Sequence, residues 1–76
     1  MIAGIWRHRV RTLYRELGLF SARDLSERYD HPLGRCYQIL SSMRRRGELA
    51  VLRRGPARGG GYVRLYAPVL GPRDLA

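Results

Sequence analysis

The sequence predicts an α+β domain in which three helices are followed by a two-stranded β-hairpin. Two observations predict this class. Apolar residues recur every three or four positions as far as Met43, which is the period of a helix, and capping residues divide this stretch into three segments. After Gly47, β-forming residues flank a glycine-rich stretch. Because the chain has 76 residues, we expect one small core.

The first helix is expected from Ile2 to Leu17. Its apolar residues have the spacing of one helix face, and they are Ile2, Ile5, Trp6, Val10, Leu13, Tyr14 and Leu17. Gly18 follows directly, and glycine is the residue that most often takes the left-handed conformation at the end of a helix. The sequence therefore predicts an amphipathic helix that ends at Gly18.

The second helix is expected from Ala22 to Tyr29, because a capping signal precedes it. Ser21 can accept a hydrogen bond from the first turn, and Asp24 can accept one from the Ser21 backbone in return. Phe20 can pack on Leu25 across this capping box. The sequence thus predicts a short helix with a defined start.

The third helix is expected to begin at Pro32, since proline is favoured in the first turn of a helix and nowhere deeper. It should run toward Arg46 and stop at Gly47. Its buried stripe would consist of Cys36, Ile39, Leu40 and Met43. Gly34 lies on the outer side of this helix.

The hairpin is expected from the strands 49–52 and 62–66, joined by a long loop over 55–61. The tyrosines of the second strand alternate with its valine and leucine, so one of these pairs should face the core and the other solvent. The sequence does not decide which pair is buried. We expect one domain over residues 1–67 and an irregular C-terminal tail over 68–76.

The charge of the chain favours a polyanionic partner. Fifteen basic residues, all of them Arg, stand against six acidic residues, which gives a net charge of +9. The segment from Arg44 to Arg64 holds seven of these arginines and one acid, Glu48, so two thirds of the excess charge lies there.

The order of helix, helix, helix, strand, loop and strand is that of a winged helix-turn-helix. The segment from Phe20 to Tyr66 resembles the MarR-like and related winged-helix transcription regulators. The resemblance rests on the run Asp24-Leu25-Ser26-Glu27, on the apolar positions Cys36, Leu40 and Met43, and on Gly47 before the hairpin. It implies sequence-specific binding of double-stranded DNA and transcription regulation, with the third helix in the major groove and the hairpin, or wing, on the backbone or minor groove.

The residues expected to contact DNA follow from this placement. Base contacts are expected from Arg35 and Gln38, because Arg can bind guanine and Gln can bind adenine with two hydrogen bonds each. Backbone contacts are expected from the rest of the outer helix face and from the wing, namely Leu33, Gly34, Tyr37, Ser41, Arg44, Arg45, Arg53, Arg54 and Arg58.

Two other functions stay open. The chain can be an RNA-binding or ribosome-associated winged helix, since the same basic surface attracts any nucleic acid. It can also be a protein-interaction adaptor whose first helix, with Ile2, Ile5, Trp6 and Val10, docks a partner. The same helix can instead form a homodimer, because most DNA-binding regulators of this size need two copies to contact two half-sites.

The sequence excludes other classes by what it lacks. No carboxylate pair, Cys–His pair or metal-ligand cluster has a usable spacing, so we expect no enzyme, no catalytic or metal site, no cofactor and no small-molecule ligand. No apolar run approaches the roughly 20 residues that cross a membrane. The single cysteine, Cys36, fits a reducing compartment, and the expected location is the cytoplasm.

Overall fold

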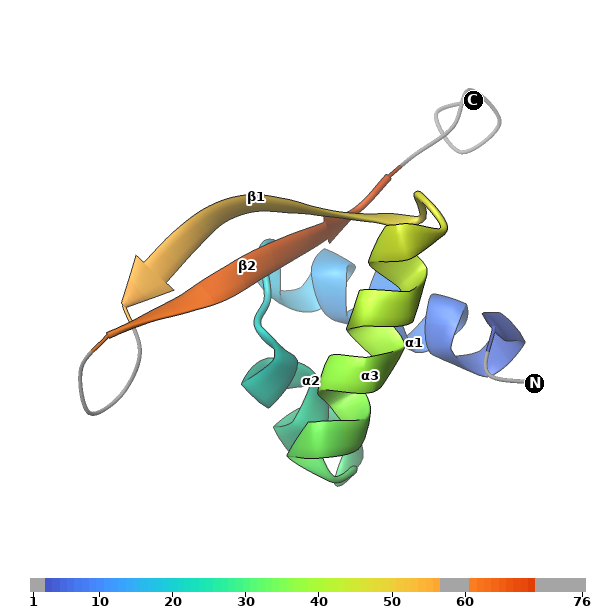
Figure 1. Ribbon diagram of the computed structural model, residues 1–76. Helices are drawn as coiled ribbons and strands as arrows, with labels where there is room; N and C mark the ends of the chain where they lie inside the picture. The colour runs from blue at the N-terminus through green and yellow to red at the C-terminus, as the bar shows by residue number, and fades with distance from the viewer. Residues whose placement is uncertain (1–2, 57–60, 70–76) are drawn as a thin grey trace.

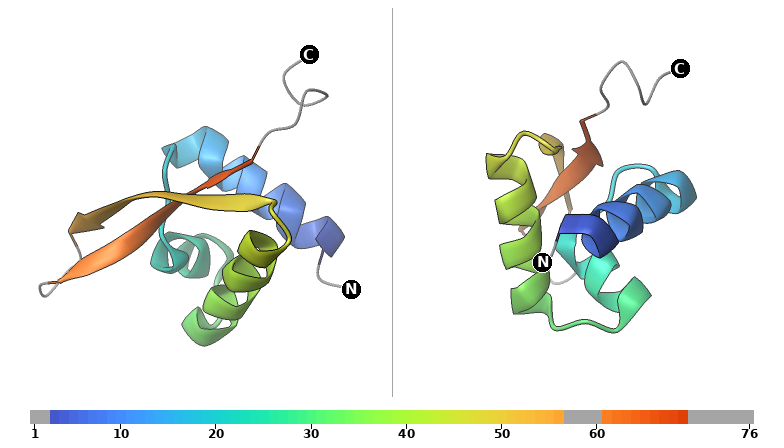
Figure 2. Two further views of the ribbon diagram at one scale, coloured as in Figure 1. Left: turned by 45° about the horizontal axis from the view of Figure 1, so that its top comes forward. Right: turned by 90° about the vertical axis from the view of Figure 1, so that its right-hand side faces the viewer.

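The computed structural model describes residues 3–56 and 61–69 and has the predicted α+β architecture, a winged helix-turn-helix layout (Figure 1). Its elements are α1 (Ala3–Leu17), α2 (Ala22–Tyr29), α3 (Leu33–Arg45), β1 (Leu49–Pro56) and β2 (Tyr62–Pro68). The two views in Figure 2 show α3 on one face of the molecule and α1 on the opposite face. No helix in the described ranges is long and apolar enough to span a membrane.

The helix α2 begins at the predicted residue and for the predicted reason. The Ser21 side chain accepts a hydrogen bond from the Asp24 N–H at 3.2 Å, and the Asp24 carboxylate accepts one from the Ser21 N–H at 2.8 Å. Phe20 and Leu25, on either side of this capping box, are both fully buried. The capping box with Asp at its third helical position is therefore confirmed.

The helix α3 begins one residue later than predicted, because Pro32 has an extended ψ of 133° and is the cap rather than the first helical residue. The predicted stop is confirmed. Gly47 has a φ of +77°, and its N–H donates to the Arg44 carbonyl at 3.0 Å. The Glu48 N–H donates to the Met43 carbonyl at 2.9 Å, which completes a Schellman motif.

One hydrophobic core lies between the three helices and the base of the hairpin. The predicted stripe of α3 is buried as a whole, and α1 contributes three of its apolar residues, Trp6, Val10 and Leu13. Ile5 and Leu17, which the same helical spacing assigned to the buried face, are 53% and 57% exposed. The apolar face of α1 is thus narrower than its sequence predicts.

The strand β1 is longer than predicted, and the loop is correspondingly shorter. Gly55 and Pro56, expected in the loop, pair with Val63 and Tyr62. A Cβ at Gly55 would lie 3.0 Å from the Leu65 side chain, so the glycine lets that side chain lie across the strand. Gly55 therefore allows close packing within the strand, whereas the sequence pattern predicts a loop at this position.

Tyr66 lies at the centre of the sheet and pairs with a residue on each side. It pairs with Val51 of β1 on one side. On the other side its N–H donates to the Phe20 carbonyl at 2.7 Å, and the Phe20 N–H donates back at 3.2 Å. This isolated bridge adds a third, one-residue antiparallel strand, which ties the α1–α2 connection to the hairpin.

Neither alternating pair of β2 is buried as a unit, so that prediction is wrong. Tyr66 is 5% exposed and Tyr62 is 78% exposed, although both lie on the same face of the strand. Val63 and Leu65 are both half-buried. The reason is that the outer half of the hairpin extends beyond the helices, so one face is covered at its base and open further out (Figures 1 and 2).

Candidate nucleic-acid interface

The outward side of α3 carries a line of small and polar residues. All four of its members are exposed and recur every three or four positions, and they are Gly34, Gln38, Ser41 and Arg45. Eleven residues of helix advance about 16 Å, so this line extends along nearly the whole helix. Three of the predicted backbone-contact residues and one predicted base-contact residue share it.

The other predicted residues of α3 flank this line. Tyr37 and Arg44 lie seven positions apart, and therefore on the same flank, which faces the hairpin because Tyr37 borders a groove with β2. Arg35 is exposed on the opposite flank, away from the hairpin. Leu33 is half-buried and packs against the core, so its side chain contributes little to the outer surface.

The first turn of α3 has backbone N–H groups without a hydrogen-bond partner inside the helix. Its cap, Pro32, makes no side-chain hydrogen bond, and the first turn holds no acidic residue. The N–H groups of Leu33, Gly34 and Arg35 precede the first bond of the helix, from the Cys36 N–H to the Pro32 carbonyl at 3.0 Å. Leu33 and Gly34 can therefore meet an anion through their N–H groups.

The wing presents two opposed arginines. Arg54 of β1 pairs directly with Arg64 of β2, and both are exposed. Arg64 lies two residues from the buried Tyr66, so it shares the face of β2 that packs on the core. Arg53 lies in β1, but its side chain is outside what the structure describes, and Arg58 lies outside the described residues altogether.

Three arginines of α1 and α2 have acidic or aromatic partners. On α1 and α2, Arg7 forms an ion pair with Glu48, Arg28 pairs with Glu16 at 3.1 Å, and the Arg9 guanidinium lies 4.6 Å from the centre of the Trp6 ring. The hydrogen bond from Arg28 to Glu16, together with the charge of that carboxylate, raises the pKa of Arg28.

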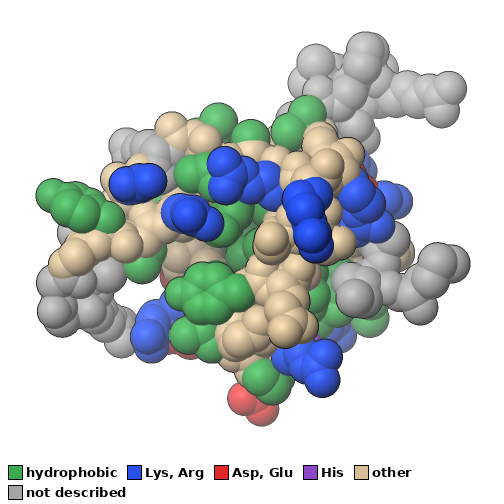
Figure 3. Space-filling view, in the orientation of Figure 1, with side chains coloured by type: hydrophobic (Ala, Val, Ile, Leu, Met, Phe, Trp, Pro, Cys, Tyr) green, Lys and Arg blue, Asp and Glu red, His purple; other side chains and the backbone are tan. Residues whose placement is uncertain are grey.

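The arginines of α3 and the wing differ from these three in their partners. Within residues 3–56 and 61–69, no carboxylate forms an ion pair with the arginines of α3 and the wing, namely Arg35, Arg44, Arg45, Arg54 and Arg64. Glu48, the acid nearest in sequence to Arg44, Arg45 and Arg54, is held by Arg7 and by Arg46 at 3.1 Å. Figure 3 shows blue side chains spread over the face formed by α3 and the hairpin, with red only at its margins.

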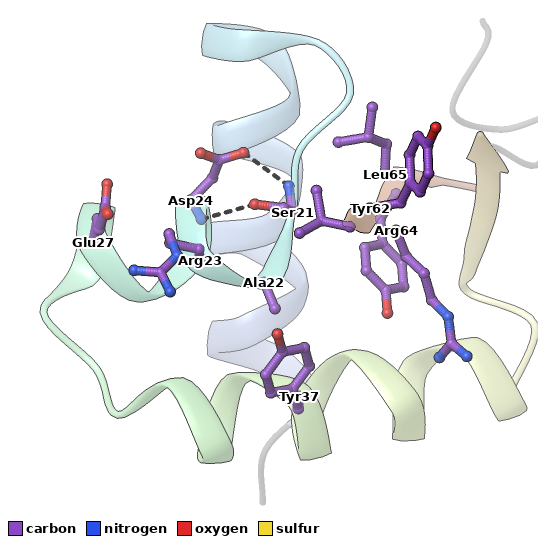
Figure 4. Close-up of a pocket in the computed structure, with 11 residues that line it drawn as sticks. Ser21, Ala22, Arg23, Asp24, Glu27, Tyr37, Tyr62, Arg64 and Leu65 are labelled. Atoms are coloured by element: carbon purple, nitrogen blue, oxygen red, sulfur yellow. Dashed lines mark hydrogen bonds between the residues drawn. The ribbon is translucent and has the colours of Figure 1, made fainter. Parts of the chain in front are cut away.

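A groove of about 450 Å³ lies between α2 and β2 and is bordered by α3 at Tyr37. Its walls come from the start of α2, from Tyr37 and from β2 between Tyr62 and Tyr66. In Figure 4, Tyr37 points from α3 toward α2, and Arg64 reaches from β2 toward α3. The groove is open to solvent and lies between elements, not inside the core.

Sequence reasoning missed two residues of this surface. The sequence assigns Arg64 only to the excess of charge and leaves Tyr62 open between core and solvent, yet both border the groove beside Tyr37. The period-two spacing of Tyr62, Arg64 and Tyr66 was the available signal, because it places the three on one face of a strand.

The surface expected for a partner helix or a second copy is small. Trp6 and Val10 are buried in the core of the chain itself, and Ile5 is the exposed member of that set. Ile2 lies outside the described residues. Docking through α1 therefore has little apolar area in the described part of the chain.

The described residues hold no group of three or more His, Cys, Asp or Glu side chains that could bind a metal ion. Cys36 is fully buried, and burial raises the pKa of its thiol. Its Sγ lies 3.9 Å from the His31 carbonyl oxygen. The thiol is therefore a small buried group, as its place on the α3 stripe predicts.

Comparison with models of known protein families finds none that matches this chain, and comparison with curated proteins finds no matching sequence.

Proposed function

We propose that this domain binds double-stranded DNA in a sequence-specific way, with α3 in the major groove and the wing on the sugar-phosphate backbone, and that it acts in transcription regulation. The observation that carries the proposal is the set of exposed arginines on α3 and the wing. Five of them, Arg35, Arg44, Arg45, Arg54 and Arg64, form no ion pair with a carboxylate of the described residues.

The shape of α3 supports a role in base recognition. A major groove about 12 Å wide admits one helix, and a line of small and polar side chains lets that helix approach the base edges closely. Gln38 lies on this line, so its amide can reach adenine, and Arg35 can reach guanine from the flank. Gly34 adds no side chain at the point of approach.

The flank that faces the wing supports a role in backbone binding. Arg44 lies on the flank of α3 that carries Tyr37, and Arg64 borders the groove from β2, so a DNA strand at the edge of the major groove can meet cations from both elements. The open N–H groups of the first turn of α3 supply a further phosphate contact.

The test is a titration of the protein with a random-sequence duplex pool, a hairpin RNA and a single strand across a salt series. We expect preference for the duplex and a steep loss of affinity with salt, about 0.9 in the logarithmic slope for each phosphate contact. Equal or tighter binding to the hairpin RNA favours the RNA-binding alternative, and no binding to any of the three at low salt favours the adaptor.

Matched variants separate base recognition from backbone binding. Arg35→Ala and Gln38→Ala should relax sequence preference at single positions by about 1 to 3 kcal/mol. Arg54→Ala should weaken binding to all duplexes alike and lower the salt slope by about one contact. Identical behaviour of the three variants would contradict the assignment of α3 to the major groove.

A further inference from the structure

The groove between α2 and β2, which Tyr37 of α3 borders, has features that a fully paired duplex does not need. Tyr62 is 78% exposed and Tyr37 is 52% exposed, and both border this groove from different elements. Within the described residues, neither ring stacks on another aromatic ring or lies under an arginine. Two open ring faces in one groove are a surface on which planar groups can stack.

Arginines accompany these rings on both sides of the groove. Arg64 lies beside Tyr62 on the wing side and Arg23 lies on the α2 side, with Tyr37 between the two arginines (Figure 4). Neither arginine has an ion-pair partner among the described residues. A basic groove with interleaved aromatic rings is the arrangement that binds single-stranded nucleic acid, because the cations follow the phosphates and the rings stack on unpaired bases.

Two carboxylates at the α2 end limit where the strand can lie. The Asp24 carboxylate is occupied by the Ser21 N–H in the capping box. Glu27 lies one helical turn beyond Arg23 and repels phosphates. An anionic strand is therefore accommodated between Arg64 and Arg23 and stops before Glu27.

We propose that this groove binds a short single-stranded extension of the duplex, so that the preferred substrate is double-stranded DNA with an unpaired end. The inference rests on the proposed function, because the strand that crosses the flank of α3 beside Tyr37 is the one whose unpaired end can enter the groove. A groove of about 450 Å³ is large enough for one or two nucleotides and has no room for a second duplex.

The test compares one duplex sequence in three forms: blunt, with a three-nucleotide 5′ overhang and with a three-nucleotide 3′ overhang. The first unpaired position carries 2-aminopurine, whose fluorescence falls when the base stacks. We expect one overhang to bind about 5- to 140-fold more tightly than the blunt duplex, because stacking of one base on an aromatic ring contributes about 1 to 3 kcal/mol. Its fluorescence should fall on binding.

Variants assign this preference to the groove. Tyr62→Ala should abolish both the preference and the fluorescence change, and Tyr62→Trp should retain them. Tyr62 is exposed, so both variants should fold, which circular dichroism checks. Leu52→Ala removes an exposed apolar side chain of β1 outside the groove and should change neither readout.

The outcomes distinguish this inference from the proposed function. Equal affinity for blunt and extended duplexes overturns the inference alone, and absence of binding to every duplex overturns both. A free mononucleotide such as AMP tests whether the groove binds a strand end or a free nucleotide. If AMP binds in the absence of DNA and Tyr62→Ala removes this binding, the groove takes a free nucleotide and the strand-end assignment is overturned.

Discussion

Arg54 and Arg64 stand directly opposite each other on the two strands of the wing. Like charges at directly opposed positions of an antiparallel pair destabilise it. No carboxylate in the described part of the chain forms an ion pair with either arginine. The free wing therefore contains a repulsion that a phosphate between the two guanidinium groups would relieve.

The first prediction tests this repulsion. Arg64→Gln should raise the free energy of unfolding by about 0.2 to 1 kcal/mol at low salt, and the gain should shrink at high salt. The same change should weaken duplex binding and lower its salt slope by about 0.9. Urea unfolding at two salt concentrations and DNA titrations measure the two effects.

A matched change of net charge controls for the first prediction. Arg15 lies in the last turn of α1, where a cation favours the helix dipole. Arg15→Gln should therefore lower the free energy of unfolding slightly and leave the salt slope of duplex binding unchanged. A loss of stability in Arg64→Gln would show that the opposed arginines do not repel measurably.

The limits of the helices could be predicted from the sequence because the signals that set them are local. The Ser21 and Asp24 capping box acts over three residues, and Gly47 ends α3 through hydrogen bonds to the preceding turn. Such signals depend little on the rest of the fold. The buried stripe of α3 follows from helical spacing alone.

The wing could be predicted only in outline, because its details depend on contacts between distant residues. The sheet register shifts at Leu52, between Val51 and Arg53, and this shift decides that Arg54 faces Arg64. The exposure of Tyr62 depends on how far the hairpin extends beyond the helices. Neither property is contained in the alternation of residues within one strand.

The second prediction concerns the end of α3. Gly47→Ala should lower the free energy of unfolding by about 1 to 2 kcal/mol, because Gly47 has a φ of +77° and an L-residue is strained there. A Cβ at this position would meet no atom within 4 Å, so the loss of stability comes from backbone strain alone. Thermal unfolding measures it, and an unchanged melting temperature would contradict the left-handed assignment.

The third prediction concerns Gly34, where the same substitution should have the opposite effect. Gly34 lies within α3, and a Cβ there would also meet no atom within 4 Å. Gly34→Ala should therefore raise stability by about 0.5 to 1 kcal/mol through helix propensity. If the α3 backbone approaches DNA at this point, the variant should bind duplex DNA more weakly although it is more stable. Unchanged affinity would place Gly34 away from the DNA.

The fourth prediction concerns the capping box of α2. Ser21→Ala removes the acceptor of the Asp24 N–H and should cost about 1 kcal/mol of stability. Ser21→Gly should cost only a few tenths, because glycine exposes the helix end to water and tolerates the cap conformation. Urea unfolding of the two variants measures the difference, and equal losses would contradict a capping role for the hydroxyl.

The fifth prediction is a loss of stability at high pH that depends on Cys36. Burial disfavours the thiolate, so the pKa of this thiol is higher in the folded chain than in the unfolded chain. Above the unfolded value of about 8.5, the unfolded chain loses its proton first, and the equilibrium moves toward unfolding. The contribution of the thiol to stability is therefore complete below about pH 8.5 and is lost as the pH rises through the folded pKa.

Urea unfolding at pH 7.5 and at pH 9.5 tests the dependence on Cys36. The free energy of unfolding of the wild type should fall between these values, with a slope of at most about 1.4 kcal/mol per pH unit for one proton. Cys36→Ala should be less stable at both pH values, because it leaves a small cavity among the buried residues of α3. Its further loss at pH 9.5 should be smaller than that of the wild type, since only the wild type carries the thiol. An equal pH dependence in the two proteins would contradict the role of Cys36.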